Sequence, residues 1–158
     1  MELDKFDLAI LEALQKDARI SLQELGKQVG LTSSPCWNRI RRMEEAGVIE
    51  GYSVRINPEK IGLTETVILH VTIDSHSDEA LFEFGQALEG IPEVLEAFLV
   101  SGDYDYYIRV AVEGTRGYER FLRERLYKIP GIRNSKSSFV LRRLKQSQLP
   151  LRRPATDE

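Results

Sequence analysis

One stretch of the sequence combines residue types that could read DNA with a spacing that places them together. Between Thr32 and Met43 there are three arginines and no acidic residue. In the major groove, arginine forks onto guanine and asparagine onto adenine, and small serines near a helix start allow close approach. The pattern predicts DNA contact for the following residues: Ser33, Ser34, Trp37, Asn38, Arg41 and Arg42. Trp37 could equally be a core residue.

Other kinds of chemistry find little support in the sequence. Cys36 is the single cysteine, which excludes an intramolecular disulfide framework and a multi-thiolate metal site. His70 and His76 are isolated, and we recognise no Ser/His/Asp set, phosphate-binding loop or metal-ligand spacing. We therefore expect no enzymatic activity, no metal and no cofactor.

Charge and hydropathy set the broad class of protein. The chain has 158 residues and a formal net charge of −3, which taken alone argues against a nucleic-acid partner. Local charge decides whether phosphates are attracted, and residues 133–154 include seven basic residues and no acidic one. This run either contacts DNA or forms a solvated edge strand and a loose tail. The first residues lack a signal-peptide core, and no apolar stretch could span a membrane, so we expect a cytoplasmic protein.

Three helices must position the DNA-reading residues. The first is capped by Asp4 and runs to about Lys16; the second starts with the capping box of Ser21 and Glu24 and ends at Gly30. Thr32 or Ser33 caps the third, which ends at Gly47. Its apolar face is expected to hold Cys36, Ile40 and Met43, with Ser34, Asn38 and Arg41 opposite. This is helix-turn-helix patterning, although a generic three-helix bundle with a solvated basic face would look similar.

The sequence after residue 52 changes character. Residues 52–56 are expected to be extended, and Pro58 and Gly62 mark a linker. Strands are then predicted at 64–73, 94–100, 104–112 and 134–144, with helices capped by Ser77 or Asp78 and by Thr115. The helix-to-strand junction Ile91–Val94 recurs 38 residues later as Ile129–Ile132, so the order is β-α-β twice.

Two such repeats predict a ferredoxin-like sheet of four antiparallel strands with both helices on one face. The other sheet face would then need cover. Its expected residues include Ile68, Ala97, Leu99 and Ala111. A second subunit is the simplest cover for this apolar sheet face, so we expect at least a dimer.

The two segments together resemble the Lrp/AsnC (leucine-responsive, or feast/famine) family of transcription regulators. Seven pieces carry the likeness in order along residues 3–151: Leu3-Asp4 with Asp7 and Ile10-Leu11; Ser33–Trp37 with Arg39-Ile40; Met43–Ile49; Ile61–Leu63; Gly102–Tyr106; Pro130–Ile132 with Ser137–Phe139; and Leu149–Leu151.

The resemblance implies an α+β protein in which a winged helix-turn-helix precedes a ferredoxin-like βαββαβ domain for ligand sensing and assembly. The expected divisions are 1–51 for DNA binding, 52–63 for a strand and hinge linker, 64–147 for the effector domain and 148–158 for a tail. The family forms dimers that assemble into tetramers or octamers and respond to amino acids. The resemblance also implies that the protein binds double-stranded DNA and is associated with the nucleoid.

The resemblance further places an effector at an interface between dimers, where a turn meets a neighbouring subunit. An aspartate could bind the ammonium group of a free amino acid, and backbone N–H groups or serines its carboxylate. The candidate residues are Gly102, Asp103, Tyr104, Asp105, Ser137 and Ser138. Alternatively, the Gly-Asp pair serves only as a hairpin turn.

Three functions remain open on the sequence. The first is a DNA-binding transcription regulator whose assembly or DNA binding responds to an amino acid or related metabolite. The second is a ligand-independent architectural protein that bends or wraps DNA. The third, an amino-acid-binding accessory domain of a metabolic enzyme, has no use for Asn38 and Arg41 on an outward helix face.

Overall fold

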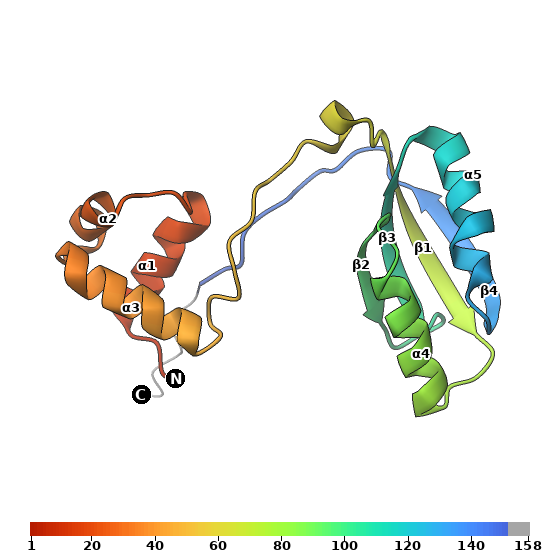
Figure 1. Ribbon diagram of the computed structural model, residues 1–158, viewed down its shortest axis with the longest axis horizontal. Helices are drawn as coiled ribbons and strands as arrows, with labels where there is room; N and C mark the ends of the chain where they lie inside the picture. The colour runs from red at the N-terminus through yellow and green to blue at the C-terminus, as the bar shows by residue number, and fades with distance from the viewer. Residues whose placement is uncertain (152–158) are drawn as a thin grey trace. The chain divides into compact units, whose positions relative to one another are not determined.

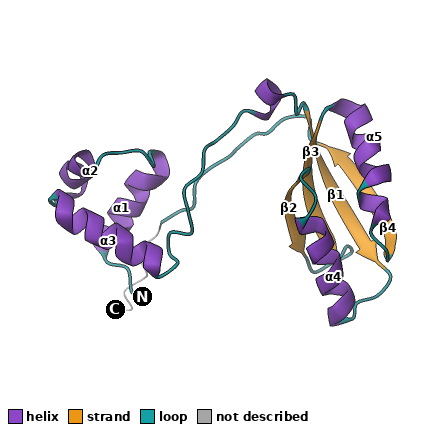
Figure 2. Cartoon of the chain, in the orientation of Figure 1, coloured by secondary structure: helices purple, strands orange, loops and turns teal. Residues whose placement is uncertain are grey.

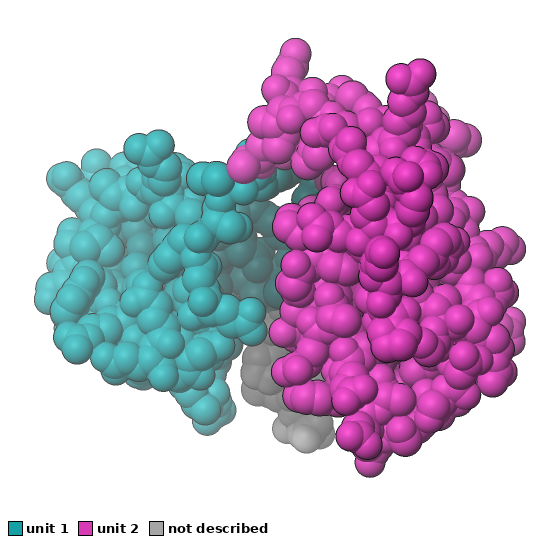
Figure 3. All heavy atoms as spheres, turned by 45° about the vertical axis from the view of Figure 1, so that its right-hand side comes forward, with its two compact units in different colours: residues 1–55, 145–158 teal, residues 56–144 magenta. Residues whose placement is uncertain are grey.

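The computed structural model describes residues 1–151, which form two compact units (Figure 3). One unit contains residues 1–55 together with the chain from Lys145 onward, and the other contains Ile56–Leu144. The C-terminal segment therefore returns to the first unit three residues before the expected end of the effector domain. Residues 152–158 of the expected tail, with Arg152 and Arg153, lie outside the described residues. In the described part, no helix is long and apolar enough to cross a membrane.

The first unit is built on three helices, α1 (Lys5–Lys16), α2 (Leu22–Val29) and α3 (Ser33–Glu45) (Figure 1). Asp4 caps α1 by accepting hydrogen bonds from the backbone N–H groups of Phe6 and Asp7, and Ser21 caps α2. Gly30 ends α2 in the left-handed conformation, with φ of 74°, which glycine adopts at little cost. Thr32 precedes α3 without a side-chain capping bond. The three predicted helices are confirmed.

The core of this unit lies where the three helices meet. Its fully buried residues include Ile10, Leu25, Cys36 and Met43, with Ile40 packed against them. The predicted apolar face of the third helix is therefore confirmed. Burial also raises the pKa of the Cys36 thiol, which identifies Cys36 as a packing residue rather than a reactive one.

The close approach of α2 to the following turn gives a stability prediction. A Cβ on Gly26 would lie 2.5 Å from the backbone oxygen of Leu31, and backbone can yield only by distorting the turn. We expect Gly26→Ala to destabilise the first unit by about 1–3 kcal/mol, measured by urea titration of Trp37 fluorescence. Gly30→Ala is the matched control: its Cβ meets nothing within 4 Å, so only the αL strain of about 1–2 kcal/mol applies. Wild-type stability of Gly26→Ala would contradict the packing.

The segment between the units differs from the expected strand. Residues 51–57 have no strand ladder with any other described residue, and Pro58–Ile61 forms a 3-10 turn, η1. The alternation of Tyr52, Val54 and Ile56 is real, but these side chains are 52%, 80% and 62% exposed. The prediction of a strand was wrong for this chain by itself, because an alternating segment becomes a strand only where a neighbour completes its hydrogen bonds.

The second unit has an α+β architecture, in which one layer of helices packs on one β-sheet (Figure 2). Its elements follow in the order β1 (Glu65–Ile73), α4 (Asp78–Glu89), β2 (Val94–Leu99), β3 (Tyr106–Val112), α5 (Gly114–Glu124) and β4 (Ile132–Phe139). The strands lie in the order β2-β3-β1-β4, with every neighbouring pair antiparallel. Both helices cover the same face, which confirms the predicted ferredoxin-like arrangement.

A core lies between this sheet and its helices. β1 contributes Val67, Leu69 and Val71, while Phe84 of α4 and Phe121 of α5 fill the space above the sheet. Some predicted bounds were wrong. The third strand begins at Tyr106 rather than 104, and the last spans Ile132–Phe139 rather than 134–144. Helix α5 begins at Gly114, so Thr115 lies in its first turn instead of capping it.

No helix within residues 1–151 covers the opposite face of the sheet. The predicted composition of this open face was half wrong. Ile68 and Ala111 lie on this open face, as predicted, since Ala111 pairs with Thr66. Ala97 and Leu99 instead lie on the helix side, opposite Ile108 and Tyr106. The register shift between Val94 and Glu96 is the reason: a bulge inserts one residue and inverts the alternation beyond it.

Candidate DNA-binding surface and effector site

The outer face of α3 presents the predicted DNA-reading residues to solvent. Ser33, Ser34, Trp37, Asn38 and Arg41 are all exposed. The guanidinium of Arg41 lies 5.4 Å from the centre of the Trp37 ring, and its Nε donates to Glu45 at 2.8 Å. Neither the ring contact nor the ion pair uses the Nη groups of Arg41, so these N–H groups can donate to another partner. The face therefore offers donors and an aromatic surface of the kinds that contact bases.

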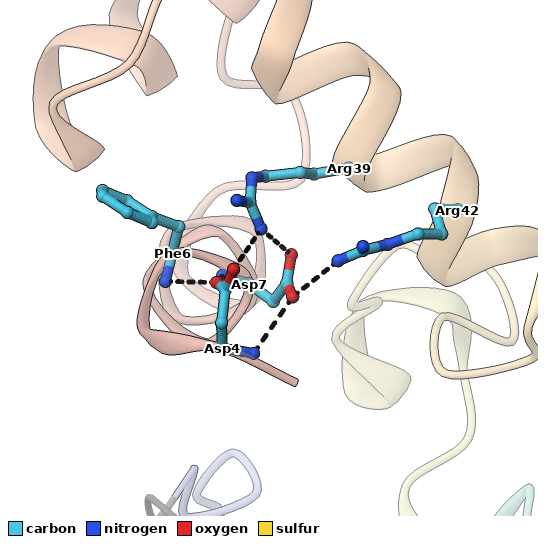
Figure 4. A network of polar contacts seen from close by, with 5 residues as sticks. All are labelled: Asp4, Phe6, Asp7, Arg39 and Arg42. Carbon is cyan, nitrogen blue, oxygen red and sulfur yellow. Dashed lines mark hydrogen bonds and ion pairs between the residues drawn. The ribbon is translucent and has the colours of Figure 1, made fainter. Parts of the chain in front are cut away.

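Arg42 differs from its neighbours because it is turned toward α1 (Figure 4). Its Nη2 donates to Oδ2 of Asp7 at 2.8 Å, and Asp7 is fully buried. Arg39 donates from Nη1 to Asp7 and to Asp4, at 2.8 and 2.7 Å. Hydrogen bonds to the two aspartates raise the pKa of Arg39. These contacts join α3 to α1 through charge, beside the apolar core.

Sequence reasoning did not find a role for Asp7 or Arg39. The available signal was the pair of aspartates at the start of α1, each accepting a backbone bond from the other's residue. A capping box explains the position of both aspartates along the chain, and nothing local indicates that their remaining oxygens meet arginines more than thirty residues away.

The turn between β2 and β3 contains four of the predicted effector residues, which differ in exposure and in their contacts with the rest of the chain. Gly102 has φ of 126°, and Asp103 is exposed with no hydrogen bond or ion pair to another described residue. Tyr104 packs on the imidazole of His70, with ring centres 4.9 Å apart. Asp105 is engaged by its own chain: Oδ2 accepts from the backbone N–H of Ile73 at 2.9 Å, and Oδ1 lies 2.8 Å from Nε2 of His76.

The contacts of Asp105 give a pH prediction. Burial by itself would raise the pKa of Asp105, but the Ile73 N–H and the His76 ring outweigh it, and the pKa lies below its ordinary value of 3.8. A carboxyl with a lowered pKa stabilises the fold above the unfolded pKa, and this contribution is lost as pH falls through the lower, folded value. We expect Asp105→Asn to be less stable than wild type above about pH 5, with the difference shrinking below pH 3.8.

Urea titrations of both proteins at several pH values measure this difference. Asp103→Asn is the matched control, because the Asp103 carboxylate makes no bond to a described residue, and its stability should follow wild type throughout. A stability difference for Asp105→Asn that persisted at the lowest pH would contradict the assignment.

The two serines of β4 point to opposite sides of the sheet. Ser137 pairs with Leu69 and contacts the hydroxyl of Tyr118 on α5, with the two oxygens 2.5 Å apart. Ser138 pairs with Ile68 on the open face. Within one subunit, Ser137 and Ser138 therefore do not share a site. His76, which sequence reasoning had set aside as isolated, is instead the partner of Asp105. Within residues 1–151, no cluster of His, Cys, Asp and Glu could hold a metal ion.

Both units match known protein-family models. Residues 3–50 match the winged helix-turn-helix DNA-binding model, and residues 66–150 match the Lrp/AsnC ligand binding domain. The leucine-responsive regulatory protein of Escherichia coli is 37% identical over 146 residues, which cover 92% of this chain and 89% of that protein.

Solved structures agree over the same range. An AsnC family transcriptional regulator from Agrobacterium tumefaciens aligns with a TM-score of 0.89 and 38% identity, covering 94% of this chain and 97% of the other. A transcriptional regulator of Neisseria meningitidis, solved as its L-Met complex, aligns with a TM-score of 0.88 and 32% identity over the same shares. A helix-turn-helix with a solvated polar face and a ferredoxin-like ligand-binding domain thus occur in one chain, in the order these relatives have. The chain belongs to the Lrp/AsnC family of transcription regulators, which are DNA-binding proteins and not enzymes.

Proposed function

We propose that this regulator reads DNA through the exposed face of α3 and that a free amino acid, bound by the second unit, alters its assembly or its DNA binding. The observation that carries the DNA part is the solvated row of Ser34, Asn38 and Arg41, opposite a face buried in the core. Such a row can enter the major groove while the buried face holds the helix in place. Ser33 and Trp37 flank this row, and Arg42 lies at its edge.

The effector part rests on the ligand-binding domain and on the relative that was solved with L-Met. Asp103 is the better candidate of the two aspartates for the ammonium group, because its carboxylate has no partner among the described residues. Asp105 already has two partners within its chain and fixes the turn from behind. The backbone of Gly102, the ring of Tyr104 and serines 137 and 138 are the remaining candidates for contact with the ligand.

A second subunit completes this proposal in two ways. The open sheet face exposes apolar side chains such as Phe98, which is 51% exposed, and a second copy of the chain would cover them. Ser137 and Ser138 face opposite sides of the sheet, so a ligand that contacts both a Ser137 and a Ser138 takes them from different subunits. We propose a homodimer that assembles further, to a tetramer or octamer, and binds double-stranded DNA of the nucleoid in the cytoplasm. Several weakly basic recognition helices on one assembly bind DNA together far more tightly than one helix alone, because each further contact is intramolecular.

A thermal-shift panel of the twenty amino acids tests the effector. A ligand that binds only the folded state stabilises it by about 2.7 kcal/mol at a hundred times its Kd, so at least one amino acid should raise the melting temperature. Asp103→Asn should lose this shift, and Glu83→Gln, the same chemical change at an exposed site on α4, should keep it. No stabiliser, with DNA binding intact, would favour a ligand-independent architectural protein.

A further inference from the structure

We propose that Asp7 is a positioning residue for DNA binding: it holds the guanidinium of Arg42 at the edge of α3, where the remaining N–H groups contact a DNA phosphate. This inference rests on the proposed function, since it requires α3 to lie in the major groove. It assigns Asp7, Arg39 and Arg42 three separate tasks.

Both oxygens of the Asp7 carboxylate accept hydrogen bonds from its own chain (Figure 4). Oδ1 accepts from Arg39 Nη1 at 2.8 Å, and Oδ2 accepts from Arg42 Nη2 at 2.8 Å and from the backbone N–H of Asp4 at 3.1 Å. The side chain has no exposed surface. A buried carboxylate held from three directions has a fixed orientation, so it can fix the orientation of what it binds.

The two arginines that Asp7 binds are in different situations. Arg39 is 25% exposed, divides its Nη1 between Asp4 and Asp7, and lies 5.4 Å from the centre of the Phe6 ring. Its contacts fasten α3 to α1. Arg42 is 53% exposed and donates one hydrogen bond to a described residue. A guanidinium has five N–H donors in a rigid fork, so Arg42 keeps donors for an outside partner in a direction that Asp7 sets.

The place of Arg42 on α3 favours a phosphate over a base. Asn38 and Arg41 lie on the exposed face of α3, whereas the side chain of Arg42 extends toward the start of α1 (Figure 4). A helix in the major groove has base edges in front of it and phosphates along both rims. The charges of the two aspartates and the two arginines cancel, so the buried carboxylate does not repel the phosphate.

Salt dependence of DNA binding separates this role from a structural one. The probe is a fluorescent mixed-sequence duplex, since phosphate contacts do not depend on sequence. Its affinity for the full chain is measured by anisotropy between about 50 and 200 mM KCl. The logarithm of affinity falls with the logarithm of salt by about 0.9 for each phosphate neutralised. Arg42→Ala should reduce that slope by about 0.9 for each recognition helix engaged, and Arg42→Lys, which keeps a charge, should restore it.

A double-mutant cycle tests the part played by Asp7. Asp7→Asn should weaken binding, and adding Arg42→Ala to it should cause little further loss, because both changes remove one oriented contact. Trp37 fluorescence checks that the variants at Asp7 and Arg42, which lie in the same unit as Trp37, are folded. The control is Arg123→Ala, which changes an exposed, ion-paired arginine of α5 and should leave the slope unchanged; its folding is checked by hydrogen exchange of the β1 and β3 amides. If Asp7→Asn does not fold, the salt slopes of Arg42→Ala and Arg42→Lys still test whether Arg42 contacts a phosphate.

Three outcomes would overturn the inference while wild type still binds: an unchanged slope for Arg42→Ala, Arg42→Lys behaving as Arg42→Ala, or additive losses in the cycle. A wild-type chain that bound no duplex would instead overturn the proposed function itself.

Discussion

Replacing Asn38 and Arg41 together by alanine should abolish sequence recognition without unfolding the protein. Each bidentate contact between a side chain and a base is worth about 1–3 kcal/mol of discrimination. Losing two such contacts in each helix should therefore weaken binding to a duplex selected from a random pool by roughly a hundredfold or more. Both side chains are exposed, so the free energy of unfolding should change little. Anisotropy titration of the selected duplex, beside an unrelated duplex, measures the loss.

The unrelated duplex is essential to this experiment, because binding to it depends on phosphates and should fall much less than binding to the selected one. Glu12→Ala is the control variant, since it changes an exposed residue of α1 and should bind the selected duplex like wild type. Unchanged recognition by the Asn38/Arg41 double variant would revive the hypothesis of an amino-acid-binding accessory domain.

Phe121→Ala should destabilise the second unit by about 3–5 kcal/mol, the usual cost of truncating a buried phenylalanine to alanine. Phe121 is 1% exposed and lies in the core between α5 and the sheet. The single tryptophan, Trp37, lies in the first unit, so its fluorescence reports the unfolding of that unit alone. Unfolding of the second unit is followed by hydrogen exchange of the β1 and β3 amides. We expect β1 and β3 to lose protection while the Trp37 transition changes little.

Phe82→Ala is the matched control, because Phe82 is 63% exposed on α4 and the chemical change is the same. Its expected cost is within about 0.5 kcal/mol. Equal effects of Phe82→Ala and Phe121→Ala would contradict the core described for the second unit.

The helices of the first unit were predictable because their signals are local. Asp4, Ser21 and Gly30 act within a few residues of where they stand, and the apolar spacing of Cys36, Ile40 and Met43 identifies the buried face directly. The ion pairs of Asp7 were not predictable. They join residues more than thirty positions apart, and their existence depends on how α1 and α3 pack.

The sheet shows the same division between local and distant causes. The β-α-β repeat predicted the topology, yet the bulge at Leu95 reversed the sides of Ala97 and Leu99. Alternation assigns residues to faces only while the register is regular. The candidate effector residues were found as a turn and two serines, but their division between the two sides of the sheet emerges only from the pairing of β4 with β1.

The most direct test of an amino-acid-responsive DNA-binding regulator is the affinity of the wild-type chain for its selected duplex, measured with and without each of the twenty amino acids. We predict that at least one amino acid changes the Kd or the number of chains bound per duplex, and that the same amino acid stabilises the folded protein against heat. Tight binding with a Kd and stoichiometry unaffected by all twenty would contradict this account.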